Sequence, residues 1–482
     1  QSVLELLSQI KIAKVVSFFK NENSDHLYVV KINTGNEEVQ IVTGANNFKE
    51  GDLVPYLGVG ATVPGFLFKG DEIVLEARKM RGYESFGMIL AEDEIGLSDD
   101  HEGIMIIQGS EDLISKDILQ VLSEDQINTV LKNAGALEDP RLEGLHLVVD
   151  EILGEEDLLK LIDAKAKINH YIGFEISGLV HLGTGLMAGL VIRELQKLGV
   201  HTKIFLADWH TWINEKLNGD TELIKKVAYE YFAPAMKISA QIAGADPEKI
   251  EFVLGTDLYH SNDRYWQTVV EVSKNLTLSR VLKSTTILGR EESENMKFAM
   301  LIYPPMQVAD IFEMENQIAH AGTDQRKCHV IAREVALDLN INPLRNAEGQ
   351  KMKPITIHHS LVAGLQAPAE WPLPDNVDKK EFMSKYKMSK SVPGSAIFIH
   401  DEPDQIRSVI RKAFCPEKEV GYNPVLNWVE KMIFPIKGSF ELHREEKFGG
   451  NRTFDTFEDL KGAYENGEIY PLDLKNNVAE IL

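Results

Sequence analysis

Cysteine is almost absent from this sequence of 482 residues. Only Cys328 and Cys415 occur, far apart and with no short Cys/His spacing around either. This scarcity excludes a disulfide-stapled secreted domain and a zinc site built on closely spaced cysteines. The pattern favours a reducing compartment, and we predict a cytoplasmic protein without a bound metal.

Long apolar runs are also missing. Stretches such as residues 186–192 are far shorter than the ~18 residues that a membrane span needs. The chain does not open with a charged segment followed by an apolar one. We therefore predict no membrane partner.

Basic residues are outnumbered, since 51 Lys and Arg face 74 Asp and Glu, giving a net charge of −23. This balance argues against binding of nucleic acid by the surface as a whole, because phosphate contacts depend on Lys and Arg. A local basic strip can still bind RNA on an acidic protein. With 44% hydrophobic residues, the chain is long enough for about three domains.

The pattern of apolar residues changes along the chain. Short β-branched runs separated by glycines, at residues 27–32, 39–42 and 73–75, predict a small all-β barrel. Residues 110–167 have helical spacing, typical of a connector followed by the first helices of the next domain. We predict a barrel over residues 1–108 and a helical linker over 109–141.

From Tyr171 onward, apolar strands alternate with helices. The predicted strands cover residues 171–174, 202–207 and 250–254, and a helix is predicted over 184–198. This alternation predicts an α/β domain with a doubly wound parallel sheet. We place it at residues 142–392. After Asp401 the pattern is helical without strand alternation, so residues 393–482 are predicted to form a separate helical domain.

Two segments of the α/β domain suit nucleotide chemistry. Residues 173–183 follow a predicted strand and open a helix, where backbone amides and the helix dipole favour an anion. Residues 387–391 (Lys-Met-Ser-Lys-Ser), followed by Val-Pro-Gly, place two lysines in a polar loop. Taken singly, the first is also compatible with an ordinary turn and the second with a solvated loop.

In this order and roughly two hundred residues apart, the two segments resemble the paired signatures of class I aminoacyl-tRNA synthetases. The resemblance implies a Rossmann-like catalytic domain that uses ATP with Mg²⁺ as a substrate, without a tightly bound cofactor. Lys387 and Lys390 would face the pyrophosphate and His181 the phosphates, where charge develops during adenylate formation. The family usually has a second histidine where this chain has Thr184, which can donate a hydrogen bond but carries no charge. The residues implied for ATP binding and catalysis are Gly173, His181, Gly183, Thr184, Asp324, Lys387, Met388, Ser389, Lys390 and Ser391.

Residues 303–310 (Tyr-Pro-Pro-Met-Gln-Val-Ala-Asp) look like the tyrosyl branch of this class. Tyr303, Gln307 and Asp310 are four and three residues apart, so they share one face of a helix. The resemblance implies that Tyr303 and Gln307 hold the amino group of tyrosine, while Asp310 and Tyr171 bind its phenolic hydroxyl. Alternatively, the tyrosines are core aromatics and Asp310 is a surface charge.

Residues 322–327 (Gly-Thr-Asp-Gln-Arg-Lys) are similar to a glycine-rich loop of that family. By resemblance, Asp324 would meet the ribose of ATP and Gln325 the amino acid. Arg326 and Lys327 would meet the acceptor end of the tRNA, or form a solvated helix start. Asp208 and His210 match the strand end beside the tyrosine pocket, where His210 is alternatively a packed edge residue.

Both ends of the chain carry candidate tRNA contacts. The C-terminal region resembles a helical anticodon-binding domain, in which Phe448 and Tyr470 would stack on the first anticodon base and Asp473 would hydrogen-bond it. A loop and a helix cap are the alternative. Residues 23–28, 41–45 and 78–88 resemble a tRNA-binding barrel of the oligonucleotide-binding (OB) fold.

The barrel contains a basic strip next to two aromatic residues, Tyr83 and Phe86. This combination suits backbone contact with base stacking, although the charges are also compatible with a purely structural barrel. The basic residues are Lys69, Arg78, Lys79 and Arg81.

Taken together, these resemblances imply an enzyme that activates tyrosine with ATP and loads it onto tRNA(Tyr), acting as a homodimer. A tryptophanyl enzyme would share the sheet and both ATP motifs, but would not need the pair of Tyr171 and Asp310. A non-catalytic tRNA-binding protein with a synthetase-like fold is the alternative from another class. The departure at Thr184 is compatible with it, whereas the intact motif 387–391 argues against it.

Overall fold

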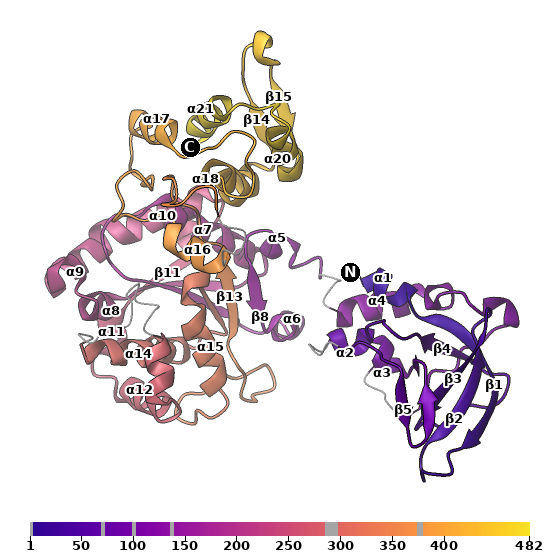
Figure 1. The fold of residues 1–482 in the computed structure, drawn as a ribbon. Coiled ribbons are helices and arrows are strands. Elements are labelled where there is room, and N and C mark those ends of the chain that lie inside the picture. The colour runs from indigo at the N-terminus through magenta and orange to yellow at the C-terminus, as the bar shows by residue number, and fades with distance from the viewer. Residues whose placement is uncertain (1–2, 69–72, 99–102, 135–138, 285–296, 374–378) are drawn as a thin grey trace. The chain divides into compact units, whose positions relative to one another are not determined.

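A computed structural model describes residues 3–68, 73–98, 103–134, 139–284, 297–373 and 379–482. The chain divides into two compact units, Gln1–Leu142 and Glu143–Leu482. Figure 1 shows their elements, and each unit is described by itself.

The first unit is built on a five-stranded antiparallel sheet with the order β3-β2-β1-β4-β7. Its strands are β1 (Lys11–Lys20), β2 (Tyr28–Asn33), β3 (Glu38–Thr43), β4 (Leu53–Leu57) and β7 (Met88–Ile89). One face of the sheet covers a core that includes Val15, Val30, Ile41 and Val54. The edge strand β3 is not left open, since Phe86 N–H donates to Gln40 O (2.9 Å) and Val42 N–H to Ser85 Oγ (3.0 Å). Closure of the edge gives the strand-rich domain a barrel-like form.

A second, two-stranded sheet joins β5 (Arg78–Met80) to β6 (Tyr83–Ser85). The β-branched run at residues 73–75 pairs with residues 60–63 through an antiparallel bridge from Val74 to Thr62 and backbone hydrogen bonds such as Val63 N–H to Ile73 O (2.9 Å). This pairing is too short to form a named strand. The helices of this unit are α1 (Val3–Ser8), α2 (Pro64–Phe68), α3 (Glu92–Ile95) and α4 (Glu124–Asn133), with 3₁₀ turns at Glu111–Leu113 and Ile118–Gln120.

The second unit contains a six-stranded sheet with the order β11-β10-β9-β12-β13-β8. Its strands are β8 (Glu151–Leu153), β9 (Asn169–Phe174), β10 (His201–Leu206), β11 (Ile250–Leu254), β12 (Ile318–Gly322) and β13 (Ile355–His359). Strands β9 to β13 are parallel, which confirms the predicted doubly wound class. Strand β8 lies at the edge of the sheet and is antiparallel to β13. The prediction was wrong here, because these residues lie in the stretch that was predicted to be helical.

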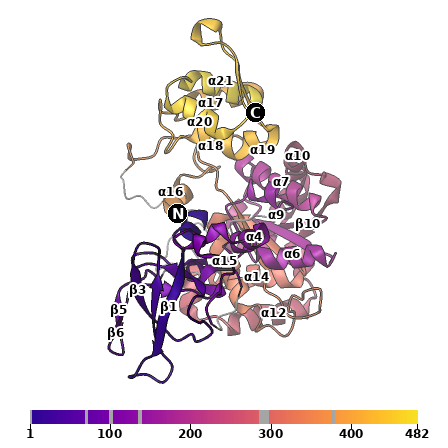
Figure 2. The same ribbon diagram turned by 90° about the vertical axis from the view of Figure 1, so that its right-hand side faces the viewer.

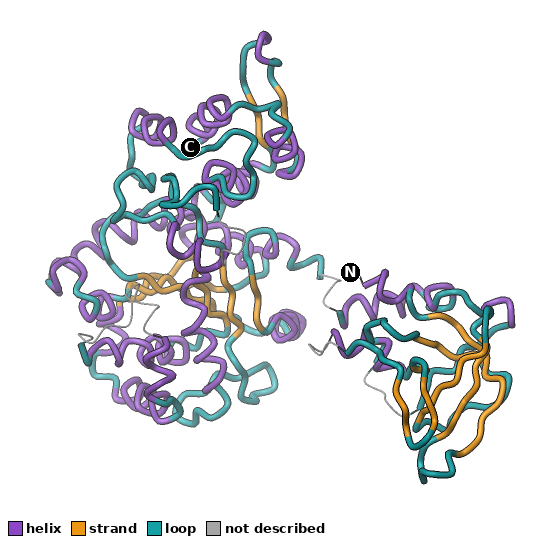
Figure 3. The backbone as a smooth tube through the Cα atoms, viewed as in Figure 1, coloured by secondary structure: helices purple, strands orange, loops and turns teal. Residues whose placement is uncertain are grey.

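Helices cover both faces of this sheet, as Figures 1 and 3 show. Helices α7 (Leu182–Lys197) and α10 (Ala233–Ile242) lie on one face, and α12 (Asp263–Lys274), α14 (Ala299–Glu313) and α15 (Arg326–Val335) on the other. The remaining elements before residue 400 are α5 (Glu143–His146), α6 (Glu155–Asp163), α8 (Asp208–Ile213), α9 (Thr221–Val227), α11 (Gly255–Tyr259), α13 (Leu278–Ser284) and α16 (Lys379–Tyr386), a π-helical turn at Ala228–Phe232, and 3₁₀ turns at Lys216–Gly219, Pro247–Lys249 and Thr323–Gln325.

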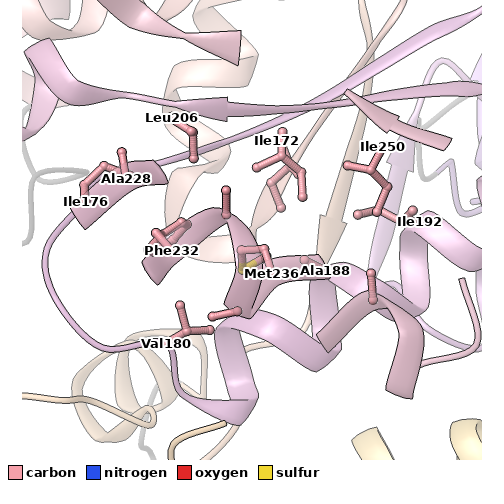
Figure 4. Packing of buried hydrophobic residues seen from close by; sticks show 14 of the residues in the cluster. Ile172, Ile176, Val180, Ala188, Ile192, Leu206, Ala228, Phe232, Met236 and Ile250 are labelled. Atoms are coloured by element: carbon pink, nitrogen blue, oxygen red, sulfur yellow. The ribbon is translucent and has the colours of Figure 1, made fainter. Parts of the chain in front are cut away.

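A hydrophobic core fills the space between the sheet and α7 and α10 (Figure 4). Ile172 of β9 and Leu206 of β10 face Met236 of α10 there. The two helices approach closely at Gly185 and Gly189. A Cβ on Gly185 would lie 2.2 Å from Ser239 Oγ, so a larger residue would push the helices apart. This packing anchors the N-terminus of α7, which opens the functional site.

The C-terminal helices gather at one end of the second unit (Figure 2). They are α17 (Pro403–Lys412), α18 (Pro424–Trp428), α19 (Phe434–Lys437), α20 (Phe457–Glu465) and α21 (Pro471–Ile481), with a π-helical turn at Val429–Ile433 and a 3₁₀ turn at Glu446–Phe448. The region is mostly helical, as predicted, and it also contains a short hairpin that the sequence did not indicate, in which β14 (Phe440–Leu442) pairs with β15 (Arg452–Phe454). Trp428 Nε1 donates to the carbonyl of Ala363 (2.7 Å), which ties these helices to the segment after β13.

Candidate active site

A cavity of ≈ 340 Å³ opens at the carboxyl ends of β9 and β12. After β9, the next two strands of the chain, β10 and β11, lie on one side of β9 in the sheet, and β12 lies on its other side. Ligands of open α/β sheets bind at such a switch point, because the connections leave in opposite directions and open a crevice. The topology therefore locates the site independently of any motif.

The cavity brings together most of the predicted ATP and tyrosine residues. Its lining includes Tyr171, Gly173, His181, Gly183, Thr184, Tyr303, Gln307, Asp310, Asp324, Gln325, Lys387, Met388 and Lys390. Ser389 and Ser391 are not among the lining residues, and their hydroxyls lie 2.9 Å from each other. These two serines therefore contact one another at the surface of the loop instead of facing the cavity.

His181 begins helix α7 as its N-cap residue. Its Nδ1 accepts the backbone N–H of Thr184 at 3.2 Å, and Thr184 Oγ1 lies 3.2 Å from Nε2. Burial lowers the pKa of His181 to about 4, and the nearby Lys390 and Lys387 lower it further. The imidazole is therefore neutral near pH 7, and because Nδ1 accepts, its proton lies on Nε2, from which it can be donated.

The lysine loop, residues 387–391, contacts both the segment after β13 and the start of α7. Met388 N–H donates to Val362 O (2.7 Å), and Gly183 N–H points to Met388 Sδ at 3.3 Å. Lys387 pairs with Asp324, and Lys390 donates to Ser177 Oγ. Burial lowers the pKa of Lys390 to about 8. The two motifs thus meet, and both ammonium groups belong to residues that line the cavity.

Asp310 also lines the cavity, where its carboxylate is buried, since the residue is only 1% exposed. Its Oδ1 accepts the hydroxyls of Tyr259 (2.9 Å) and Tyr265 (3.0 Å). Burial raises the pKa of Asp310, and the two hydrogen bonds oppose that effect. Neither tyrosine was identified from the sequence, since each is 45 or more residues away from Asp310 along the chain.

Glu175 is a further polar residue of the cavity that the sequence analysis missed. It accepts the hydroxyl of Tyr303 (2.9 Å) and both its oxygens accept the amide of Asn214 (3.0 and 3.2 Å). Desolvation raises the pKa of Glu175, which these hydrogen bonds counteract. Glu175 lies within the segment 173–183, but nothing in that segment alone reveals its partner Tyr303.

Two buried polar atoms of the cavity wall have no hydrogen-bond partner among the described residues. They are Gln307 Oε1, an acceptor, and His210 Nε2, 3.6 Å from Asp310 Oδ2. A buried polar atom without a partner costs free energy, so such atoms mark positions that a ligand can satisfy. They lie in the cavity with a tyrosine hydroxyl, that of Tyr171, and the carboxylate of Asp310.

Comparison with known proteins agrees with this geometry. A family model described as "tRNA synthetases class I (W and Y)" matches residues 163–482. A tyrosine–tRNA ligase of Pyrococcus horikoshii is 52% identical over 360 residues, which are 74% of this chain and 92% of that protein. The chain belongs to the tyrosyl-tRNA synthetase family.

Further comparisons extend the match to both units of the synthetase. A tyrosine–tRNA ligase of Thermococcus kodakarensis is 55% identical over 334 residues, covering 69% of this chain and 88% of that one. A crystal structure of tyrosyl-tRNA synthetase complexed with L-tyrosine from Pyrococcus horikoshii matches with a TM-score of 0.68 and 53% identity, over 71% of this chain and 93% of that one. Residues 10–113 match a model described as "Putative tRNA binding domain".

Buried histidines form a chain that reaches the wall of the synthetase cavity, which His320 and His359 line. His170 Nε2 lies 3.1 Å from His320 Nδ1, and His320 Nε2 lies 2.7 Å from His359 Nδ1. Burial lowers the pKa of all three, so the chain is neutral. Among the residues that the structure describes, no group of His, Cys, Asp and Glu is arranged to hold a metal ion.

The predicted tRNA contacts of the synthetase lie outside the cavity. Arg326 binds Glu151 through two nitrogens (2.7 and 2.8 Å), and Lys327 beside it is exposed. Phe448 and Tyr470 are 52% and 53% exposed, and Asp473 is half-buried in the first turn of α21. Both aromatic rings therefore present a face to solvent.

The basic strip of the first unit lies on the β5–β6 hairpin. Arg78, Lys79 and Arg81 are exposed there, whereas Lys69 lies outside the described residues. The ring of Tyr83 packs edge-on against Phe19 at 5.5 Å between centroids, and Phe86 is 42% exposed.

Asp208 differs from these residues because it is engaged inside the protein. It is buried and accepts the backbone N–H groups of Trp209 and Thr256 (3.0 Å each), so it orders the segment after β10.

Within the described residues, no helix of the synthetase is long and apolar enough to cross a membrane.

Proposed function

We propose that this synthetase activates tyrosine with ATP, taken as its Mg²⁺ salt, and transfers it to tRNA(Tyr). One observation carries the proposal: a single cavity is lined both by a buried carboxylate, Asp310, and by two lysines, Lys387 and Lys390. The first suits a ligand hydroxyl, and the second suits phosphate.

Tyrosine binding follows from the polar atoms of the cavity wall. Asp310 Oδ2 accepts the phenolic hydroxyl, with Tyr171 next to it. Gln307 Oε1 and the hydroxyl of Tyr303, with Gln325 from the loop after β12, accept the amino group. Glu175 supports this arrangement, since it holds Tyr303 in place and adds negative charge near a bound ammonium.

Activation requires a carboxylate oxygen of tyrosine to attack the α-phosphorus of ATP. The bond from that phosphorus to the bridging oxygen breaks, and pyrophosphate leaves. Lys387 and Lys390 stabilise the negative charge of the phosphates, and the Nε2 proton of neutral His181 adds a hydrogen bond. Asp324, released from Lys387, binds the ribose.

Transfer begins when a hydroxyl of the terminal tRNA ribose attacks the carbonyl carbon of the adenylate. The ester bond forms, the bond from the carbonyl carbon to the phosphate oxygen breaks, and AMP leaves with the electron pair while the hydroxyl proton passes to the departing phosphate. Arg326 and Lys327 contact the acceptor end, and Phe448, Tyr470 and Asp473 the anticodon. We further propose a homodimer, the commonest closed assembly, acting in the cytoplasm where charged tRNA is consumed.

Tyrosine alone is expected to support rapid ATP–pyrophosphate exchange when all twenty amino acids are tried. Phenylalanine should be rejected, because it leaves the buried Asp310 and the hydroxyl of Tyr171 without a partner. Exchange that is faster with tryptophan than with tyrosine would overturn the assignment. No exchange with any amino acid would favour a non-catalytic tRNA-binding protein.

We also propose that the first unit binds tRNA backbone through the β5–β6 hairpin. Changing Arg78, Lys79 and Arg81 together to alanine should weaken tRNA binding and reduce the slope of log affinity against log salt by about one unit for each phosphate that is no longer neutralised. Filter binding over a range of salt concentrations measures both quantities. Exchange should not change, because the adenylation residues belong to the other unit.

A matched variant separates this local effect from that of net charge. Lys20, Lys31 and Lys49 are also exposed on the barrel, and changing these three to alanine removes the same charge. An equal loss of tRNA affinity in both triple variants would contradict a specific role of the hairpin.

A further inference from the structure

Asp310 is held by two tyrosines that do not themselves line the cavity. Tyr259 comes from α11 and Tyr265 from α12, and both donate their hydroxyl to the same oxygen, Oδ1, at 2.9 and 3.0 Å. Tyr259 is 2% exposed and Tyr265 is 0% exposed. Their influence on a ligand is therefore indirect, through the carboxylate of Asp310.

The aromatic packing fixes the positions of these two hydroxyl oxygens. The rings of Tyr259 and Tyr265 lie 4.4 Å apart between centroids, at an angle of 31°. Trp266 packs against Tyr265 at 5.1 Å, and Trp209 against Tyr259 at 5.3 Å. Such packing holds both rings in single rotamers, so the positions of both hydroxyl oxygens are set before a ligand arrives. The other groups within reach are more distant, His210 Nδ1 for Tyr259 at 3.5 Å and Met306 O for Tyr265 at 3.4 Å.

The two hydroxyls make the oxygens of Asp310 unequal. Oδ1 already accepts two protons, whereas the nearest ion-pairing contact of Oδ2 in the described structure is His210 Nε2 at 3.6 Å, too far for a hydrogen bond. Burial keeps His210 neutral by lowering its pKa to about 3. Oδ2 is thus left as a buried acceptor on the side of His210, a residue of the cavity wall.

We infer that Tyr259 and Tyr265 are positioning residues for substrate choice: by saturating Oδ1 they turn Asp310 into a single-acceptor site that selects an amino acid with a phenolic hydroxyl. This inference rests on the proposed function, tyrosine activation. The hydrogen bonds of the tyrosines also favour the ionised, accepting form of the carboxylate, because they oppose the rise in its pKa that burial causes. A protonated Asp310 would instead present a donor, which competes with the donor of the substrate.

The test uses full-length Tyr259→Phe and Tyr265→Phe variants in ATP–pyrophosphate exchange. For each variant, kcat/KM for tyrosine should fall about 10-fold, the lower end expected for removal of a hydrogen bond to a charged group. The effect should lie in KM for tyrosine, with kcat almost unchanged, since neither hydroxyl approaches the phosphates. Exchange with phenylalanine should not fall, so the tyrosine-to-phenylalanine ratio decreases.

Two controls distinguish positioning from a merely structural role. Tyr464→Phe also removes a buried hydroxyl, which donates to Pro416 O at 2.8 Å far along the chain, and it should change melting temperature without changing the ratio. In an Asp310→Ala background, the two Tyr→Phe changes should no longer affect the ratio, because nothing is left to position.

The outcomes separate this inference from the proposed function. Wild-type enzyme without tyrosine-dependent exchange would overturn the proposed function and the inference with it. An active wild type in which Tyr259→Phe and Tyr265→Phe lower tyrosine- and phenylalanine-dependent exchange equally would overturn the inference alone. A persisting effect on the ratio in the Asp310→Ala background would overturn it as well.

Discussion

Replacing Lys387 by alanine is expected to slow formation of tyrosyl-adenylate by about 10²–10³-fold, the usual effect of removing one donor that stabilises a transition state. The affinity for tyrosine should barely change, because Lys387 is not among the residues that we propose to bind tyrosine. Stopped-flow measurement of a single turnover gives the rate, and equilibrium binding gives the affinity.

Lys385 provides the matched control for this variant. Lys385 is an exposed residue of α16, two positions before Lys387. Its ammonium lies over the ring of Tyr386, 5.5 Å from the ring centroid. Lys385→Ala removes a charge of the same sign close to Lys387 in the chain. It should leave the rate within about 2-fold of the wild type, as expected for exposed surface substitutions. If both variants have the wild-type rate, the lysine loop is only a surface feature.

The sequence predicted those parts of the site whose residues lie close together in the chain, on one helix or in one motif. The spacing of Tyr303, Gln307 and Asp310 requires only that residues 299–313 be helical, and α14 brings all three to the cavity. The ATP motifs were predictable as a pair, but the way they meet was not. It depends on backbone hydrogen bonds such as that from Leu182 N–H to Ile397 O, between residues far apart in the chain.

The sequence did not reveal those contacts of the site that join residues far apart in the chain. Glu175 meets Tyr303 across 128 residues, and the two tyrosines reach Asp310 from other helices. The edge strand β8 was missed because its three residues are too few to show a period of two within a helical stretch. Pairing with β13 makes it a strand, and only the tertiary structure supplies that neighbour.

Removal of the Asp310 side chain should have the largest effect on the choice of amino acid. Asp310→Ala takes away the charged acceptor of the phenol, which costs about 1.5–3 kcal/mol, and it also leaves the hydroxyls of Tyr259 and Tyr265 buried without a partner. We expect kcat/KM for tyrosine to fall by about 10²–10³-fold, mainly through KM.

Phenylalanine should be affected in the opposite sense, because it no longer has to desolvate a carboxylate that it cannot satisfy. The tyrosine-to-phenylalanine ratio of kcat/KM in pyrophosphate exchange should therefore collapse by at least as much as the value for tyrosine falls. Asp263→Ala, an exposed position at the start of α12, serves as the control and should leave the ratio unchanged. If Asp310→Ala preserved the ratio, discrimination would have to come from the shape of the cavity, and the buried carboxylate would have no part in choosing the substrate.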